Sequence, residues 1–288
     1  MASDGGRRAG SEVADRSSKL LGLGAGGTRG VAIALTSTVV FFVVVAVLVT
    51  HPPGWHEVRR TFFDWHEFRS SLPEITRAFE LNVKIFSIAE VFILAFALLL
   101  AVIRSLPGPV FFPLRALAIV YADFFRGVPT ILVIAILGFG APALALKGVP
   151  TSTTFWGIVA LVLVYSAYVS EVYRAGIESV HPSQEAAARS LGLSRWQGLR
   201  FVILPQAVRR VIPPLLNDFI GLQKDTALVA LIGPIEAFRQ SQIDVAATFN
   251  YTPYLCTALL FVLLTIPMAR LTDWLIARDR RRQLAGAA

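Results

Sequence analysis

The feature that most constrains the fold of this chain is a series of apolar runs close to the length needed to cross a lipid bilayer. The first clean example, Val31–Val49, holds 19 residues and no charged side chain. Because about 20 consecutive apolar residues cross the hydrocarbon core as a helix, such runs predict membrane spans. Only 16% of the residues are charged and the mean hydropathy is +0.63, whereas roughly a quarter of a soluble domain is charged. We therefore expect an all-α integral membrane protein.

Polar or charged connectors separate six such runs. The fifth run is the weakest because it carries Asp218, Lys224 and Asp225, and its Pro213-Pro214 pair predicts a bent or broken helix. No small-x-small cleavage site follows the first run, so we expect that run to remain as a membrane helix. The six predicted spans are Val31–Val49, Ile85–Ile103, Val128–Leu146, Phe155–Val172, Val211–Ile232 and Tyr254–Ile276.

The positions of the basic residues predict the orientation of these spans. With the N-terminus in the cytoplasm, the inside segments hold 18 Lys and Arg, and the outside segments, the first of them counted over Thr50–Asn82, hold 6. Such an excess is typical of the cytoplasmic side of membrane proteins. We therefore predict that both termini and the connector Tyr173–Arg210 are cytoplasmic.

The spans and connectors predict four parts of the chain. The permease-like part is the longest, and its cytoplasmic loop, residues 180–207, is called the coupling loop below. The parts are a flexible cytoplasmic tail at 1–30, an extra N-terminal transmembrane helix with an extracytoplasmic loop at 31–80, a transmembrane domain at 81–278 and a basic C-terminal tail at 279–288.

Charge and cysteine content exclude several classes of protein. The net charge of +8 could indicate nucleic-acid binding, but most basic residues lie in tails and loops between apolar runs, as topology signals do. Cys256 is the single cysteine, so neither an internal disulfide nor a cysteine metal site is expected. The four histidines form no HExxH motif, and no metal site is predicted.

The coupling loop reads as two short helices around a turn. Pro182 suits a first helical turn, and the alanines that follow favour helix. Gly192 can adopt the left-handed conformation that ends a helix. Ser194 and Gln197 form a capping box for the second helix, which Pro205 stops or kinks.

The spacing of this segment is more specific than a helical hairpin requires. Glu185-Ala186-Ala187, then Gly192, then Leu204-Pro205 resembles the EAA loop of ABC importer permeases, with Val202 where isoleucine is usual. Flanking motifs at 125–129, 173–177 and 217–228 resemble the polar amino-acid branch of that family, which takes up histidine, glutamate, glutamine, arginine and opines. The resemblance covers Leu81–Arg278, so the role of the first helix and its loop stays open.

The resemblance implies a type I importer permease, with a five-helix core plus the N-terminal helix, in the bacterial cytoplasmic (inner) membrane. In that family the loop docks in a groove on a separate ATPase subunit, which binds ATP and Mg. A second permease copy or a related permease, an extracytoplasmic amino-acid-binding protein and membrane lipid are the other expected partners. The sequence itself contains no G-x-x-x-x-G-K-[ST] stretch, so we expect no cofactor, catalytic residue or ATP hydrolysis in this chain. The loop residues assigned to coupling are Glu185, Ala186, Ala187, Gly192, Leu204 and Pro205.

Glu185 has two interpretations of similar weight: it pairs with a basic residue of the partner, or it stabilises the first turn of its own helix. Ionisable groups inside spans are candidates for the solute path because their burial is costly. For Lys224 and Asp225 we favour neutralisation within the bundle, and Asn217 and Gln223 are weaker candidates for lining the path.

An ion-pair ladder along one helix face is indicated by the spacing of Glu171, Arg174 and Glu178. We favour this structural role for Glu171 over contact with the solute. The alternative function is a secondary transporter driven by an ion gradient, which would explain the buried charges but not the long coupling loop. A membrane-anchored structural or signalling protein is a third class, for which no receiver or catalytic sequence is present.

Overall fold

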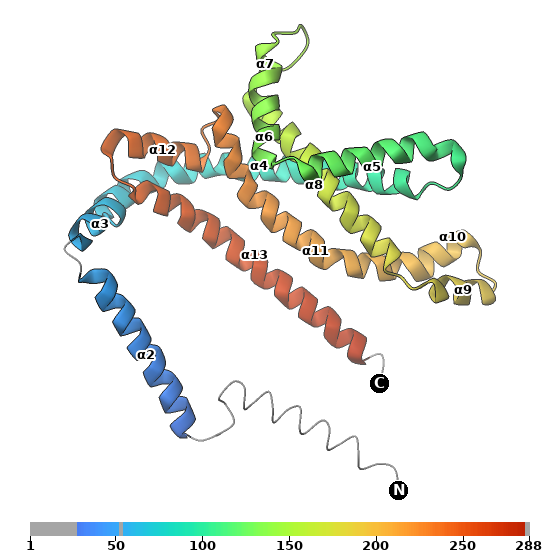
Figure 1. Ribbon diagram of the computed structural model, residues 1–288, viewed down its shortest axis with the longest axis horizontal. Helices are drawn as coiled ribbons and strands as arrows, with labels where there is room; N and C mark the ends of the chain where they lie inside the picture. The colour runs from blue at the N-terminus through green and yellow to red at the C-terminus, as the bar shows by residue number, and fades with distance from the viewer. Residues whose placement is uncertain (1–27, 52–53, 286–288) are drawn as a thin grey trace. The chain divides into compact units, whose positions relative to one another are not determined.

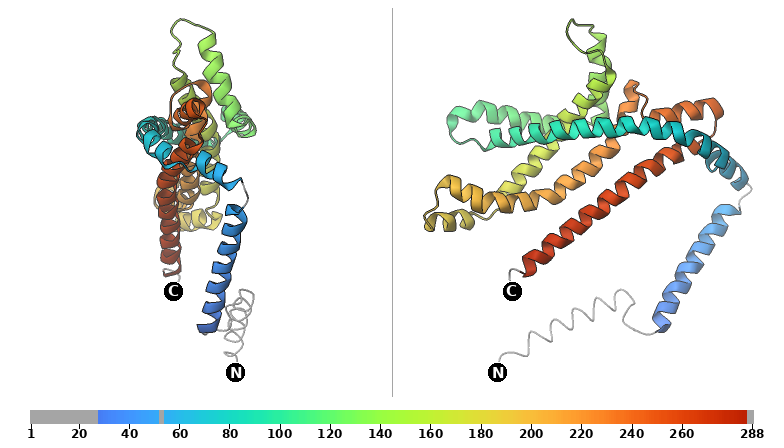
Figure 2. Two further views of the ribbon diagram at one scale, coloured as in Figure 1. Left: turned by 90° about the vertical axis from the view of Figure 1, so that its left-hand side faces the viewer. Right: turned by 180° about the vertical axis from the view of Figure 1, so that it is seen from behind.

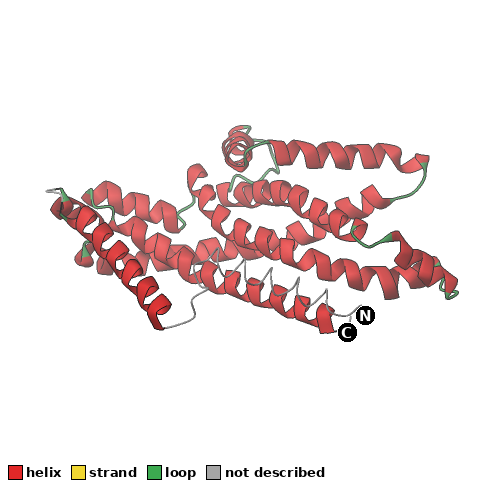
Figure 3. Cartoon of the chain, turned by 60° about the horizontal axis from the view of Figure 1, so that its bottom comes forward, coloured by secondary structure: helices red, strands yellow, loops and turns green. Residues whose placement is uncertain are grey.

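The computed structural model describes residues 28–51 and 54–285, so the predicted tail at 1–30 falls almost wholly outside the described residues (Figure 1). The chain divides into two compact units, Met1–Arg60 and Thr61–Ala288. Within the described ranges every regular element is a helix, as predicted (Figure 3). The second unit contains the coupling loop and the candidate solute path.

The first unit contains one long apolar helix, α2 (Thr28–Thr50). Its described side chains from Val31 to Leu48 are all exposed. The hydroxyls of Ser37 and Thr38 donate to the carbonyl of Ala34, so these polar groups are paired inside the helix. The predicted first span is thus helical and is long and apolar enough to cross a membrane.

Helix α3 (Trp55–Phe62) follows, and then α4 (Trp65–Ser105), which has 41 residues. The predicted extracytoplasmic loop up to residue 80 is therefore mostly helical, and its side of the membrane stays a prediction. Asp64 caps α4 by accepting from the backbone N–H groups of His66 and Glu67 at 2.8 and 3.3 Å. Phe68, Leu72, Ile75 and Phe79 then repeat with helical spacing and pack against Ala237 and Cys256.

The predicted third span, Val128–Leu146, is helical from Thr130 to Ala143, and the connector before it contains a further helix. Helix α5 (Phe112–Gly127) and the segment α6–η2–α7, running from Thr130 to Ala143, form a pair bent by 102°. Val128 is extended, with φ −94° and ψ 130°, and Pro129 is the N-cap of α6. The residue before a proline is disfavoured in helical conformation, which explains the break. The described bounds are α6 (Thr130–Ala135), η2 (Ile136–Gly140, π-helical) and α7 (Ala141–Ala143).

Helix α8 (Thr153–Glu178) contains the predicted fourth span, and α11 (Leu204–Asp225) contains most of the fifth. The break expected at Pro213-Pro214 does not occur, because α11 continues through both prolines. The two prolines cannot donate hydrogen bonds to the carbonyls of Arg209 and Arg210. Both of these residues are exposed, so the helix can continue with these two carbonyls unpaired inside it. The helix changes instead at Thr226 into the 3₁₀ helix η4 (Thr226–Ile232).

Helix α12 (Ala237–Thr248) and the long α13 (Thr252–Ala285) complete the chain. Four helices of the described residues are long and apolar enough to cross a membrane, or five if the bent pair forms one span. The segment α11–η4 is not among them. The core lies where α4 meets α8: Ile85, Ala89, Ile93 and Ala97 line one face of α4 and pack against residues of α6, α8, α11 and η4.

Candidate coupling loop and solute path

The coupling loop consists of two short helices and a turn. Helix α9 (Pro182–Ser190) begins at Pro182, as predicted, and α10 (Arg195–Gly198) continues through the π-helical segment η3 (Leu199–Ile203) into α11. Pro205 lies in the first turn of α11. The helix does not stop there, but its hydrogen-bond pattern is π-helical in the five residues before Leu204. Helices α8 and α11 converge on this loop (Figures 1 and 2).

The turn between α9 and α10 has the predicted geometry. Gly192 has φ +79°, which confirms its left-handed conformation. The N–H of Gly192 donates to the carbonyl of Arg189 at 2.9 Å, and that of Leu193 donates to Ala188 at 3.1 Å. These two bonds form a Schellman motif.

The capping box that opens α10 is also confirmed. The backbone N–H of Ser194 donates to Oε1 of Gln197 at 2.9 Å, and the N–H of Gln197 donates to Oγ of Ser194 at 3.3 Å. The two ends of the turn are therefore fixed by local hydrogen bonds.

Large apolar side chains cover the outer surface of this loop. Leu191 is 81% exposed, Trp196 66% and Phe201 63%. On a surface that faces water, exposed apolar side chains of this size mark a site that binds another surface. Glu185 lies in the first turn of α9, as the second interpretation requires, and its carboxylate also accepts from Arg189 at 2.6 Å, one turn later on the same helix; pairing with a partner residue stays a prediction. The remaining predicted loop residues, Ala186, Ala187, Leu204 and Pro205, are exposed.

The predicted path residues on α11 are divided between surface and interior. Asn217 and Lys224 are exposed on this chain, whereas Gln223 is buried. Oε1 of Gln223 accepts from the Thr265 hydroxyl of α13 at 2.7 Å, and its Nε2 has no partner among the described residues. Asp225 accepts at 2.9 Å from the hydroxyl of Tyr165 on α8. Gln223 therefore joins α11 to α13, and Asp225 joins α11 to α8.

Two carboxyl groups that were not among the predicted path residues, those of Asp218 and Glu90, lie beside these residues. Oδ2 of Asp218 is buried without a partner among the described residues. Glu90 on α4 is close enough to Asp218 for their charges to repel each other. Both residues interrupt apolar runs, which is the signal by which they could have been found.

Glu171 is the centre of an ion-pair cluster, called here the Glu171 cluster, that contains Arg104, Arg126, Arg174 and Glu178. Arg174 pairs with Glu171 at 2.9 Å and also with Glu178. The predicted ion-pair ladder is therefore confirmed. Arg104 at the end of α4 also pairs with Glu171, and Arg126 at the end of α5 lies 3.8 Å from it. Side-chain exposure is 13% for Arg104 and 17% for Glu171. The cluster thus ties α8 to the ends of α4 and α5.

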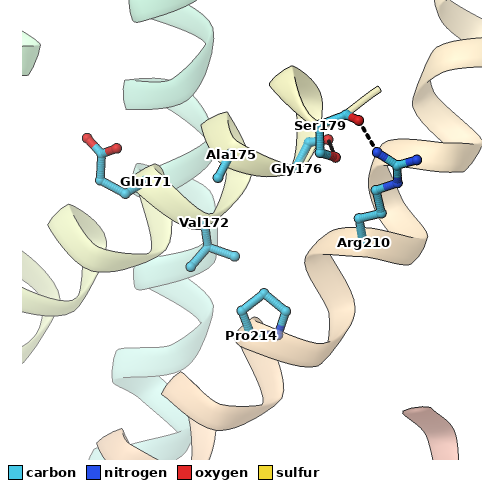
Figure 4. A pocket seen from close by; sticks show the side chains of 7 residues that line it. All are labelled: Glu171, Val172, Ala175, Gly176, Ser179, Arg210 and Pro214. Carbon is cyan, nitrogen blue, oxygen red and sulfur yellow. Dashed lines mark hydrogen bonds between the residues drawn. The ribbon is translucent and has the colours of Figure 1, made fainter. Parts of the chain in front are cut away.

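A pocket of about 360 Å³ lies between α8 and α11, close to the coupling loop (Figure 4). Its polar groups are Glu171 and Arg210, and Nη1 of Arg210 donates to the backbone carbonyl of Ser179. The pocket is lined by Glu171, Val172, Ala175, Gly176 and Ser179 of α8 and by Arg210 and Pro214 of α11.

Comparison with known proteins identifies this architecture. The family described as binding-protein-dependent transport system inner membrane component matches residues 96–281. The chain is 34% identical over 211 residues to the probable amino-acid permease protein YxeN of Bacillus subtilis (strain 168), which covers 73% of this chain and 93% of that protein. It is 36% identical over 163 residues to the probable glutamine ABC transporter permease protein GlnM of the same organism, covering 56% of this chain and 73% of that one.

Solved structures agree with this result. A crystal structure of an amino acid ABC transporter with histidines matches with a TM-score of 0.68 at 29% identity, over 75% of this chain and 98% of that chain. The MetNI methionine ABC transporter matches with a TM-score of 0.56 at 16% identity, over 71% of this chain and 95% of that chain, and shares the fold. The second unit therefore has the fold of a type I ABC importer permease.

The chain belongs to the family of binding-protein-dependent transport system inner membrane components. It is a multi-pass inner membrane permease of an ABC transporter and not an ion-gradient-driven carrier.

Proposed function

We propose that this permease forms the solute path of an ATP-driven importer for a polar amino acid, and that it couples this path to a separate ATPase subunit. One observation carries the coupling role: a rigid loop with exposed apolar side chains leads directly into α11, which holds the polar groups inside the bundle. Leu191, Trp196 and Phe201 suit insertion into a groove of the partner. Glu185 and Arg189 form a charged pair at the rim of this surface.

The ATPase would bind ATP and Mg, because this sequence has no phosphate-binding loop. An extracytoplasmic binding protein would deliver the solute, and a second permease, either a copy of this chain or a relative, would complete the path. Both termini would be cytoplasmic, which agrees with the distribution of Lys and Arg.

The path itself would run beside α11. Asp218 and Asp225 provide carboxylates for the ammonium group of an amino acid, and Lys224 provides a cation for its carboxylate. Asn217 is exposed on the same helix and would face the path or the second permease. Gln223 and Glu171 would support the path from behind, Gln223 through Thr265 and Glu171 through its arginines. The names of relatives such as GlnM support an amino acid as solute.

Reconstitution tests this proposal. The chain, the ATPase that co-purifies with it and the binding protein are placed in proteoliposomes, and uptake of each common radiolabelled amino acid is measured. We expect uptake of one or a few polar amino acids only when ATP is present on the ATPase side. Uptake that follows an imposed proton or sodium gradient without ATP would contradict the proposal, as would strict ATP-dependent uptake of a sugar or peptide and of no amino acid.

A further inference from the structure

The two ends of the coupling loop return to a close-packed crossing between α8 and α11. Gly176, near the end of α8, is buried against Ala207 and Val211 of α11, which are 2% and 6% exposed. A Cβ on Gly176 would overlap a methyl group of Val211 and would lie 3.4 Å from the carbonyl oxygen of Ala207. Small residues allow helix backbones to approach each other in this way. The crossing therefore requires glycine at position 176.

A hydrogen bond fixes the same crossing from a second direction. Ser179 is the C-cap of α8, and its carbonyl accepts from Nη1 of Arg210 on α11 (Figure 4). One of the unpaired carbonyls at the end of α8 is thus satisfied by the helix that leaves the coupling loop. Inside the loop, Nε2 of Gln206 also lies 3.3 Å from Oε1 of Gln184 on α9.

The same two helices are joined again further along. The Tyr165 hydroxyl donates to Asp225 at 2.9 Å, and a Cβ on Gly221 would lie 3.3 Å from the Tyr165 oxygen. Tyr165 precedes Gly176 by three helical turns, which is about 16 Å along α8. Two junctions separated by this distance therefore join α8 and α11.

We propose that Gly176 is a positioning residue for transport: its contact with Val211 makes α8 and α11 one rigid arm that carries movement of the coupling loop to the polar groups around Tyr165 and Asp225. The inference rests on the proposed coupling function and adds the route of transmission. Without the crossing, the loop could move while the path residues stayed in place.

A reversible covalent link across the crossing tests this directly. A Cβ at position 176 would lie 3.4 Å from Cβ of Val211, close to the separation of about 3.8 Å found in disulfides. The double variant Gly176→Cys with Val211→Cys is made in a Cys256→Ala background and reconstituted with its ATPase and binding protein. Uptake of a mixture of labelled common amino acids and ATP hydrolysis are measured before and after oxidation, and again after reduction. The single-cysteine variants, treated with the same oxidant, are the controls.

We expect the oxidised double variant to transport at least as well as the reduced one, because helices that move together tolerate a link. Loss of uptake on oxidation that returns on reduction would overturn the inference, since α8 and α11 would then have to move relative to each other. Absence of ATP-driven uptake by the unmodified complex would instead contradict the proposed function.

A rescue pair provides the second test. Gly176→Ala adds the Cβ that meets Val211, and we expect uptake per ATP hydrolysed to fall about tenfold, the size of a typical coupling between sites. Val211→Ala in the same chain removes the opposing methyl groups and should restore the ratio. Wild-type coupling in Gly176→Ala, or failure of Val211→Ala to restore coupling in a chain that assembles normally, would overturn the role of this contact.

Discussion

The side-chain amide of Asn82 on α4 donates a 2.8 Å hydrogen bond to the carboxylate of Glu236, the residue that caps α12. The same amide donates to the hydroxyl of Thr226 at 3.1 Å, and its oxygen accepts from the N–H of Ala237 at 3.0 Å. Asn82 is 2% exposed and Glu236 is fully buried. One side chain thus joins α4, η4 and α12.

Replacing this residue should therefore destabilise the whole second unit. Asn82→Ala removes one hydrogen bond each from Glu236 and Thr226, which keep other partners. It also leaves the N–H of Ala237 without its acceptor, and an unsatisfied buried group costs on the order of 2 kcal/mol. We expect a clearly lower melting temperature of the purified chain in detergent. Ser87→Ala on the same helix is the control, because the Ser87 hydroxyl bonds only to the carbonyl of Val83. Equal melting temperatures for the two variants would contradict the importance of the Asn82 contacts.

The Glu171 cluster leads to a second stability prediction. Glu171→Gln leaves Arg104, which is 13% exposed, without its anion, and breaking a largely buried pair costs about 3 kcal/mol. We expect a lower melting temperature and a lower yield of folded protein. Glu178→Gln is the matched control because Glu178 is 60% exposed and its pair with Arg174 is worth little. A control variant as unstable as Glu171→Gln would show that burial does not decide the effect.

Gly192 permits a sharp test of the coupling loop. Nothing lies within 4 Å of an added Cβ there, so Gly192→Ala acts only through its φ of +79°, at a cost of roughly 1 kcal/mol. A β-branched side chain costs more, so Gly192→Val should reduce recovery of the ATPase in pull-downs while membrane levels of the chain stay normal. Gly198→Ala, whose added Cβ makes one ordinary 3.5 Å contact, is the control. Normal ATPase recovery with Gly192→Val would refute the requirement for this turn.

The local part of this loop could be predicted from sequence because its signals act over a few residues. Gly192 and the Ser194–Gln197 box adopt the expected conformations without help from the rest of the fold. The all-helical membrane fold followed from the apolar runs for the same reason.

The failures concern features that longer-range packing decides. The first half of α4 has many charged residues, so the sequence predicted a loop there. Its apolar residues nevertheless lie on one helix face, which packs against Ala237 and Cys256. The predicted third span began at Val128, beside the 102° bend, but the sequence did not indicate that the connector before it forms helix α5. Glu171 pairs with Arg104, 67 residues away, a contact that no spacing rule predicts.

Orientation can be checked by labelling in a Cys256→Ala background. Lys147 and Leu191 are both exposed, and they lie in connectors predicted on opposite sides of the membrane. We expect an impermeant maleimide added to intact cells to label Lys147→Cys and not Leu191→Cys, and to label both after permeabilisation. Labelling of Leu191→Cys in intact cells would reverse the predicted topology.

The buried carboxylate of Asp218 should matter for transport and little for assembly. Asp218→Asn removes a negative charge that has no partner among the described residues, so folding has no ion pair to lose. We expect amino-acid uptake to fall about tenfold or more, as when a hydrogen bond between the solute and a charged group is lost. Recovery of the ATPase should stay normal. Asp273→Asn, whose side chain is 70% exposed, should transport normally. Unchanged uptake by Asp218→Asn would remove this residue from the path.

The length of α4 has a mechanical consequence. Its 41 residues span about 60 Å, twice the thickness of the hydrocarbon core. Its charged residues gather before Ile85, apart from Glu90 and Arg104, and its long apolar run follows. The first half therefore carries most of the charge of α4, and the second half carries the apolar surface suited to the bilayer core. Because one helix continues from Trp65 to Ser105, a soluble protein that pressed on the first half would tilt the second half with it.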